Sequence, residues 1–360
     1  MLGACGDSGS TATPTSVSPE PTGSGYLDSP GPYAVGRRTV TMIDPARSGR
    51  TLTVDLVYPA DPAVAAGAPG SSYVFVPGID YPSPLAKQDV PVAPGRFPVV
   101  LYSHGASGTR FISSFLTEAL ASYGFVVAAP DHLGDAAADR LLGGGVNQAE
   151  NQRMRPADVS FVLTNVLAAD AANPVGASVD PDRVAVIGHS FGGFTALTAV
   201  AGWDTVPADP RIKAVVGMAP YTRDIPDAVL ERVNVPTMLI GGTADGITPI
   251  QPNVERPWNL VPGRPLYNVE LERAGHQSFT DVCAYQQRLA SLPNAPEILR
   301  DYVTDVALQG CAPNLLDIGT AQRATISYNV AFLKVQLAGD AAYERYLGSN
   351  PPEATVTVKR

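Results

Sequence analysis

One short segment, residues 184–197, constrains the fold of this chain more than any other. Four apolar residues run into a Gly-x-Ser-x-Gly turn, and small and apolar residues follow it. This pattern predicts a buried strand, a tight turn with Ser190 at its apex, and the start of a helix. Such a turn lifts the serine hydroxyl above the end of a sheet, and it requires Gly188 and Gly192 because a Cβ at either position would clash.

The composition is that of a globular chain. Of the 360 residues, 45% are hydrophobic and 16% are charged, which is enough apolar material for a substantial core. The net charge of -9 argues against nucleic acid or an anionic membrane surface as a partner, because long-range repulsion opposes approach. The chain has no apolar run of about 18 residues, so we expect no membrane-spanning helix.

Residues 1–32 differ in character from the rest of the chain. Residues 6–32 are mainly Ser, Thr, Pro and Gly, a composition that predicts a disordered tether. The Leu-Gly-Ala that precedes Cys5 is similar to the processing box of bacterial lipoproteins, whose cysteine becomes lipidated. We therefore expect an exported protein, either secreted or tethered to a membrane through Cys5, with a signal segment encoded upstream of Met1.

Cys283 and Cys311 lie in one C-terminal region. In an exported protein such a pair favours a disulfide, whereas in a cytosolic protein the two would be buried free thiols. Closing a loop of about 30 residues would stabilise the fold by about 3–4 kcal/mol in the chain-entropy model.

Strand and helix patterns alternate along most of the chain. Half-buried antiparallel strands near a sheet edge are predicted at residues 37–43 and 52–58. Buried strands are predicted at residues 97–102, 124–129, 184–187, 212–218, 235–240 and 266–271. Helices are predicted at residues 110–123 and 155–169 and over most of 280–347. The Pro- and Gly-rich residues 61–94 predict a long excursion, and its second half is a candidate for the wall of a cleft.

These elements predict an α/β fold, in which a mostly parallel sheet is covered by helices on both faces. We assign residues 33–348 to one domain and residues 349–360 to a C-terminal tail. In such a sheet, functional residues collect at the carboxyl ends of the strands, so the loops that follow the strands should share one rim.

A serine at such a turn needs a base, and the chain has only four histidines. His189 lies inside the turn and should point away from the space above Ser190. His104 belongs to a His-Gly turn after a strand, and His132 follows the next strand. His276 lies just after the last predicted strand, so we select it as the base.

The acid that orients the base should lie between Ser190 and His276 in the chain. Asp245 follows a predicted strand through a Gly-Gly-Thr-Ala turn and is our choice. Asp224, after the preceding strand, is the competitor, although it also suits an ordinary loop position or a helix N-cap.

The developing oxyanion needs two backbone N–H donors. One is the amide of Phe191, the residue after the serine, which also lies at a helix N-terminus. The second should come from the loop after residues 97–102, where Ala106 follows the His-Gly turn.

Taken together, these motifs resemble those of serine esterases of the α/β-hydrolase superfamily. They are most similar to the group of plasma-type platelet-activating-factor acetylhydrolases and dienelactone-hydrolase-like proteins. The stretches that carry the resemblance are residues 102–111, 124–132, 188–193 and 274–276. The resemblance implies a triad of Ser190, Asp245 and His276, with Ala106 and Phe191 as oxyanion donors. Dienelactone hydrolases have a cysteine nucleophile, so that specific activity is not implied here.

We therefore expect a monomeric serine carboxylic-ester hydrolase that acts through an acyl-enzyme on short-acyl, small or lipid-like esters, without a cofactor or metal. The alternatives within enzymes are a polyester depolymerase or lipase-like enzyme, a thioesterase and an amidase. An alternative of another class is a non-catalytic surface binding protein on the same scaffold. Tyr221, Trp203 and Trp258 suit core packing better than a role in the pocket.

Overall fold

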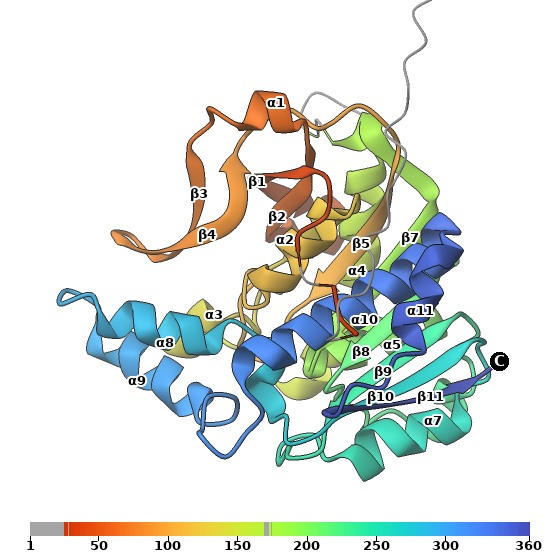
Figure 1. Ribbon diagram of the computed structural model, residues 1–360. Coiled ribbons are helices and arrows are strands. Elements are labelled where there is room, and N and C mark those ends of the chain that lie inside the picture. Colours follow the sequence, from red (N-terminus) through yellow and green to blue (C-terminus); the bar gives the residue numbers. More distant parts are fainter. Residues whose placement is uncertain (1–24, 28, 169–172, 174) are drawn as a thin grey trace, which may run out of the picture.

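The computed structural model describes residues 25–27, 29–168, 173 and 175–360 (Figure 1). In these residues, eleven strands form one sheet in the order β11-β10-β9-β8-β7-β5-β6-β2-β1-β4-β3. The bounds of the first six strands are β1 (Ala34–Asp44), β2 (Arg50–Ala60), β3 (Gly70–Val76), β4 (Ile79–Gln88), β5 (Phe97–Ser103) and β6 (Val126–Pro130). Those of the other five are β7 (Val179–His189), β8 (Ile212–Met218), β9 (Thr237–Gly242), β10 (Leu266–Leu271) and β11 (Ala354–Lys359).

The centre of the sheet is parallel, and most pairs toward its two ends are antiparallel. Strands β6, β5, β7, β8, β9 and β10 pair with one another in parallel. Antiparallel pairs join β2 to β6 and to β1, β3 to β4, and β10 to β11, whereas β1 and β4 pair in parallel. Every residue of β5 is buried, as expected for a strand that is covered on both faces. The predicted mostly parallel α/β sheet is confirmed.

The helices cover both faces of the sheet (Figure 1). The bounds are α1 (Pro62–Ala65), α2 (Ser114–Ser122), α3 (Ala137–Leu142), α4 (Gln148–Leu167), α5 (Phe191–Ala201), α6 (Asp227–Leu230), α7 (Arg256–Leu260), α8 (Val282–Ala290), α9 (Glu297–Ala307), α10 (Ile318–Ala338) and α11 (Glu344–Leu347). Val100 of β5 packs in one core with α2 and α10, and the adjacent Val99 packs in another with α4 and α5. Successive residues of a strand thus pack into the cores on opposite faces of the sheet.

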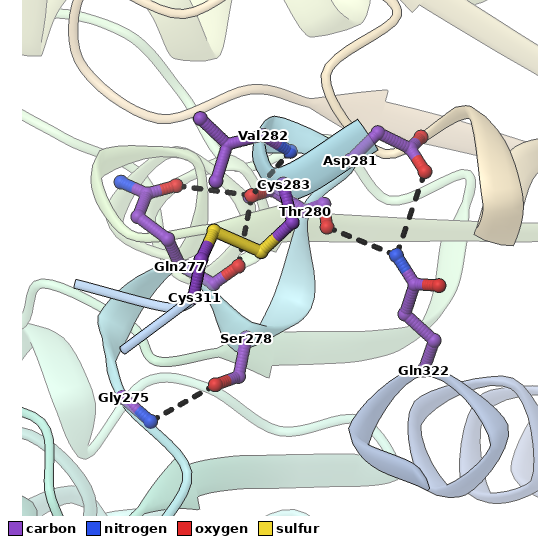
Figure 2. Close-up of a disulfide and its surroundings, with 9 residues drawn as sticks. All are labelled: Gly275, Gln277, Ser278, Thr280, Asp281, Val282, Cys283, Cys311 and Gln322. Atoms are coloured by element: carbon purple, nitrogen blue, oxygen red, sulfur yellow. Dashed lines mark hydrogen bonds between the residues drawn. A yellow bond between two sulfur atoms is a disulfide. The ribbon is translucent and has the colours of Figure 1, made fainter. Parts of the chain in front are cut away.

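A third apolar cluster lies at the β3 end of the sheet. It joins β3 and β4 to α8 and α9 through the rings of Phe75, Phe111 and Tyr285. In Figure 1 the β3–β4 hairpin and the α8–α9 pair project from the same side of the molecule. The predicted Cys283–Cys311 disulfide is present and links the start of α8 to the residues just after α9 (Figure 2).

Both ends of the predicted domain extend further than expected. The segment assigned to a C-terminal tail contains β11, which pairs antiparallel with β10 along its whole length. Tyr26 and Leu27, assigned to the tether, are buried, and the Leu27 N–H donates to Ser327 Oγ at 2.8 Å. The excursion at residues 61–94 contains the β3–β4 hairpin. Cys5 lies outside the described residues.

Within the described part of the chain, no helix combines the length and apolar character needed to cross a membrane.

Candidate active site

Ser190 sits at the sharp turn between β7 and α5. Its backbone has φ 55° and ψ -118°, a strained conformation for a residue with a side chain. The turn tolerates no Cβ at its glycines, because one on Gly188 would lie 2.0 Å from the Gly192 carbonyl oxygen, and one on Gly192 would lie 1.9 Å from the Ser103 carbonyl oxygen. The turn therefore presents the serine hydroxyl beyond the carboxyl end of the sheet, as the motif predicts.

The structure brings Ser190, His276 and Asp245 into one hydrogen-bonded chain. His276 Nε2 lies 2.9 Å from Ser190 Oγ, and His276 Nδ1 lies 2.8 Å from Asp245 Oδ2. The three residues come from the ends of different elements: Ser190 follows β7, Asp245 follows β9, and His276 follows β10. Their meeting at one rim is the arrangement expected at the carboxyl ends of parallel strands.

Asp245 is held by several donors besides the histidine. Its Oδ1 accepts the N–H groups of Ile247 and Thr248, each at 2.8 Å, and its Oδ2 accepts the Thr248 hydroxyl at 2.8 Å. Burial alone would raise the pKa of Asp245, but the hydrogen bonds and charge of His276 and the Thr248 donors lower it. The carboxylate therefore stays ionised and fixed beside the imidazole. Thr248, whose hydroxyl also lies 3.1 Å from His276 Nδ1, belongs to none of the sequence motifs.

The other three histidines have buried partners elsewhere. His189 Nε2 lies 2.9 Å from the His276 carbonyl oxygen, and burial lowers the pKa of His189 to about 3. His132 Nε2 lies 2.9 Å from Ser103 Oγ. His104 Nδ1 lies 2.7 Å from the Gly105 carbonyl oxygen. Each ring is thus engaged with a partner other than the Ser190 hydroxyl.

Asp224, the competing acid, lies apart from His276. Its Oδ2 accepts from the side-chain amides of Gln148 at 2.5 Å and Gln152 at 2.9 Å, so it is bonded to α4.

The two predicted oxyanion donors border the space next to Ser190. Phe191 is the first residue of α5, so its N–H has no acceptor within its own helix. Ala106 and Ser190 line the same cavity. A Cβ on Gly105 would lie 3.3 Å from Ser190 Cβ, which is a tight contact, so glycine suits the close approach of the Ala106 loop.

A buried arginine from α4, absent from the sequence-based prediction, lies under both donor segments. The Arg155 side chain is fully buried, and its guanidinium donates to the His104 carbonyl oxygen and to Asp135 Oδ2, the latter at 2.8 Å. Asp135 Oδ1 in turn accepts the Ser107 N–H at 3.1 Å. The guanidinium carbon lies 4.9 Å from the centre of the Phe191 ring. One cation thus contacts the loop after β5 and the start of α5.

A cavity of about 420 Å³ opens beside Ser190 and His276. Its walls come from β3, the loop after β5, α3, α8 and α9, and they are mainly apolar. Tyr221, Trp203 and Trp258 are not among the lining residues and pack against the core beneath α4 and α5 instead. Among the described residues, no cluster of three or more His, Cys, Asp or Glu side chains is placed to hold a metal ion.

Comparison with known proteins finds a matching family and several relatives. A family model described as PET hydrolase-like matches residues 93–290. A platelet-activating factor acetylhydrolase from Bos taurus is 25% identical over 230 residues, 52% of this chain and 48% of the relative. Cutinase 2 from Thermobifida cellulosilytica is 26% identical over 253 residues, 70% of this chain and 73% of the relative. The chain thus spans about half the length of the acetylhydrolase relatives that it matches.

Among solved structures, a ferulic acid esterase from Streptomyces cinnamoneus superimposes with a TM-score of 0.70 at 25% identity, covering 91% of this chain and 98% of the other. The predicted resemblance to the α/β-hydrolase serine esterases is therefore confirmed.

Proposed function

The chain belongs to the PET hydrolase-like family, and from this membership we propose that it is a serine carboxylic-ester hydrolase acting on short-acyl or small esters. The observation that carries the proposal is the continuous hydrogen-bonded chain from Asp245 through His276 to Ser190 at the wall of an apolar cavity. A serine, a base and an orienting acid in this geometry are what acyl transfer requires.

In the proposed mechanism, His276 Nε2 accepts the Ser190 proton as Oγ attacks the ester carbonyl. The Phe191 and Ala106 N–H groups stabilise the resulting oxyanion, and Asp245 stabilises the imidazolium. The imidazolium then protonates the departing alcohol, and a water molecule releases the acyl group by the same steps.

The decisive experiment replaces Ser190 by alanine. The Ser190→Ala variant should fold normally and lose p-nitrophenyl acetate turnover by about 10⁴-fold or more, because the nucleophile is removed. Ser291→Ala, an exposed serine at the end of α8, is the matched control and should keep full activity. Near-unchanged turnover by Ser190→Ala would refute the assignment.

A fluorophosphonate probe separates this proposal from a non-catalytic binding protein on the same scaffold. The wild type should be labelled and Ser190→Ala should not, because the probe reacts only with an activated serine. A folded wild type that stays unlabelled would favour the binding protein.

Polyester hydrolysis is the second candidate, and the family membership and the cutinase relatives favour it. Release of soluble acids from a polyester film would support it, with Ser190→Ala as the blank.

We also propose that the protein is exported. The Cys283–Cys311 disulfide supports this, since such bonds persist mainly in oxidising compartments. Attachment through Cys5 remains a prediction, which mass spectrometry of the membrane fraction would test.

A further inference from the structure

Resting on the proposed esterase function, we propose that the cavity beside Ser190 binds one bulky, uncharged and apolar arm of the ester, an alkyl chain or an aromatic ring. The walls from β3, α3 and α9 would then set the substrate preference. The volume of about 420 Å³ lies within the range of small-molecule pockets, about 300–1,000 Å³. It exceeds what an acetyl group needs.

The lining is apolar on facing sides of the cavity. β3 contributes Phe75, α3 contributes Leu141, and α9 contributes Tyr302 and Val306. The Tyr302 hydroxyl donates to the Ser107 carbonyl oxygen at 2.5 Å, which leaves the ring as the surface that meets a ligand. Burying an apolar arm here would be favourable because it removes apolar surface from water.

The charges at the cavity are already neutralised. Among the described lining residues, Arg110 and Asp131 are the only Lys, Arg, Asp or Glu side chains. Arg110 Nη1 lies 2.6 Å from Asp131 Oδ2, and Arg110 Nε lies 3.0 Å from Asp55 Oδ1. A charged substrate arm would lose its hydration without gaining a free partner, so the cavity should reject it.

The mouth of the cavity exposes large apolar side chains from three separate elements. Leu142 at the end of α3 is 86% exposed, Ile298 of α9 is 60% exposed, and Val74 of β3 is 50% exposed. Large apolar side chains gathered at the rim of a cavity indicate a surface that a ligand covers. An arm reaching from Ser190 past α9 would cover them.

Two of these walls lie outside the region that the family model matches. The match ends at residue 290 and begins at residue 93, so both α9 and β3 lie beyond it. Ser190, Asp245 and His276 lie inside it. Of the three walls proposed for arm recognition, only α3 therefore shares the matched region with the residues proposed for the chemistry.

The α8–α9 wall is also fixed to the histidine turn. The Gln277 N–H donates to the Gln309 carbonyl oxygen at 3.0 Å, and the Cys283–Cys311 disulfide joins the two ends of the wall (Figure 2). A Cβ on Gly310 would lie 2.7 Å from the Gln277 carbonyl carbon, which shows how closely the end of the wall approaches the residue after His276. The cavity thus has a defined position relative to the proposed base.

The test compares two series of esters. In the acyl series, kcat/KM of the wild type is measured for p-nitrophenyl acetate, p-nitrophenyl octanoate and the p-nitrophenyl monoester of suberic acid. In the alcohol series, ethyl acetate is compared with octyl acetate. We expect the eight-carbon arm to raise kcat/KM by about tenfold or more in one series, which identifies the side that enters the cavity. The terminal carboxylate should abolish the gain in the acyl series. Flat profiles in both series would overturn the proposal.

Variants of the lining residues test whether the cavity causes the preference for the eight-carbon arm. Leu142→Ser combined with Ile298→Ser removes the apolar mouth, and Ala138→Trp on the exposed face of α3 fills part of the cavity. Each should lower the ratio of eight-carbon to two-carbon kcat/KM by about threefold or more. Leu308→Ser, an exposed leucine at the end of α9 outside the cavity lining, is the matched control and should leave the ratio unchanged. An equal effect in the control would contradict the assignment.

Calorimetry of Ser190→Ala distinguishes this proposal from the proposed function. If the wild type hydrolyses no ester but Ser190→Ala binds octyl acetate at least tenfold more tightly than ethyl acetate, the function fails and the cavity assignment stands. If Ser190→Ala binds both esters equally, the cavity assignment fails whatever the wild type hydrolyses.

Discussion

At the scale of single residues, Arg155 is the most connected group under the proposed site. A buried guanidinium is costly unless its donors are paired, and here the partners are Asp135 and the His104 carbonyl oxygen. The same group lies over the Phe191 ring. We therefore interpret Arg155 as a positioning residue that sets the spacing of the two proposed oxyanion donors.

The Arg155→Lys variant tests this role. Lysine keeps the charge but lacks the planar fork that reaches several acceptors at once. We expect kcat to fall by about 10- to 100-fold with little change in KM, because oxyanion donors act on the transition state. Steady-state kinetics together with thermal melting provides the readout, and Arg153→Lys on the exposed face of α4 is the control. A lower melting temperature with unchanged kcat would indicate a purely structural role.

The sequence identifies residues whose constraint is local. Ser190 is marked by the glycines around it, and His276 emerges because the chain has few histidines. The expected order of the triad admits both Asp245 and Asp224, so only the glycine-rich turn before Asp245 favours that residue. Thr248 and Arg155 carry no such signal, because their partners come together only in the folded chain.

At the scale of elements, the α8–α9 wall depends on the disulfide at its base. In the Cys283→Ser and Cys311→Ser double variant, we expect the free energy of unfolding to fall by about 2–4 kcal/mol, because the unfolded chain is no longer cross-linked. Denaturant titration measures the change. Reductant should destabilise the wild type by a similar amount and leave the double variant unaffected. Equal denaturant midpoints for the wild type and the double variant would contradict a stabilising role of the disulfide.

Asp281 connects the wall to α2. Its Oδ2 accepts the Ser114 hydroxyl at 2.7 Å and the Phe115 N–H at 3.0 Å, and Gln322 lies on its other side (Figure 2). Burial raises the pKa of Asp281 from 3.8 to about 7. Between about pH 4 and 7 the folded state therefore holds a proton that the unfolded state has released. The resulting stability is present at acidic pH and is lost as the pH rises toward 7.

The Asp281→Asn variant isolates this contribution. We expect the free energy of unfolding of the wild type, minus that of the variant, to decrease by about 4 kcal/mol from pH 4 to pH 8. Denaturant titrations across that range measure the difference. Parallel stability curves would show that the carboxyl does not change its ionisation on folding.

Element prediction succeeds where the pattern is strong. The predicted strands at residues 212–218 and 266–271 coincide with β8 and β10. β8 is a mostly apolar run, and in β10 apolar residues alternate with Asn268 and Glu270; both patterns are typical of strands. The sequence does not predict the β3–β4 hairpin, since that region is rich in Pro, Gly and Ala and has no clear strand pattern. β11 carries an alternation of Thr and Val that predicts a strand, yet its place at the end of the chain favoured a tail.

At the scale of the whole molecule, the sheet has two free edges with different surroundings. The β3 edge borders the cavity. The opposite edge is β11, which covers the hydrogen-bonding groups of β10 from Leu266 to Leu271. Lys359 secures the end of β11, because its ammonium donates to the Trp258 carbonyl oxygen at 2.7 Å and lies 4.4 Å from the centre of the Trp258 ring.

Deletion of residues 350–360 tests whether this edge protects the fold. Without β11, the parallel strand β10 would present unpaired N–H and C=O groups, which are a template for pairing with another chain. We expect the melting temperature to fall by several degrees and concentration-dependent oligomers to appear in light scattering. Thr357→Ala, an exposed position within β11, keeps the strand and should change stability by less than about 0.5 kcal/mol. If the truncated chain melts at the temperature of the full-length protein and keeps its oligomeric state in light scattering, β10 needs no cover from β11.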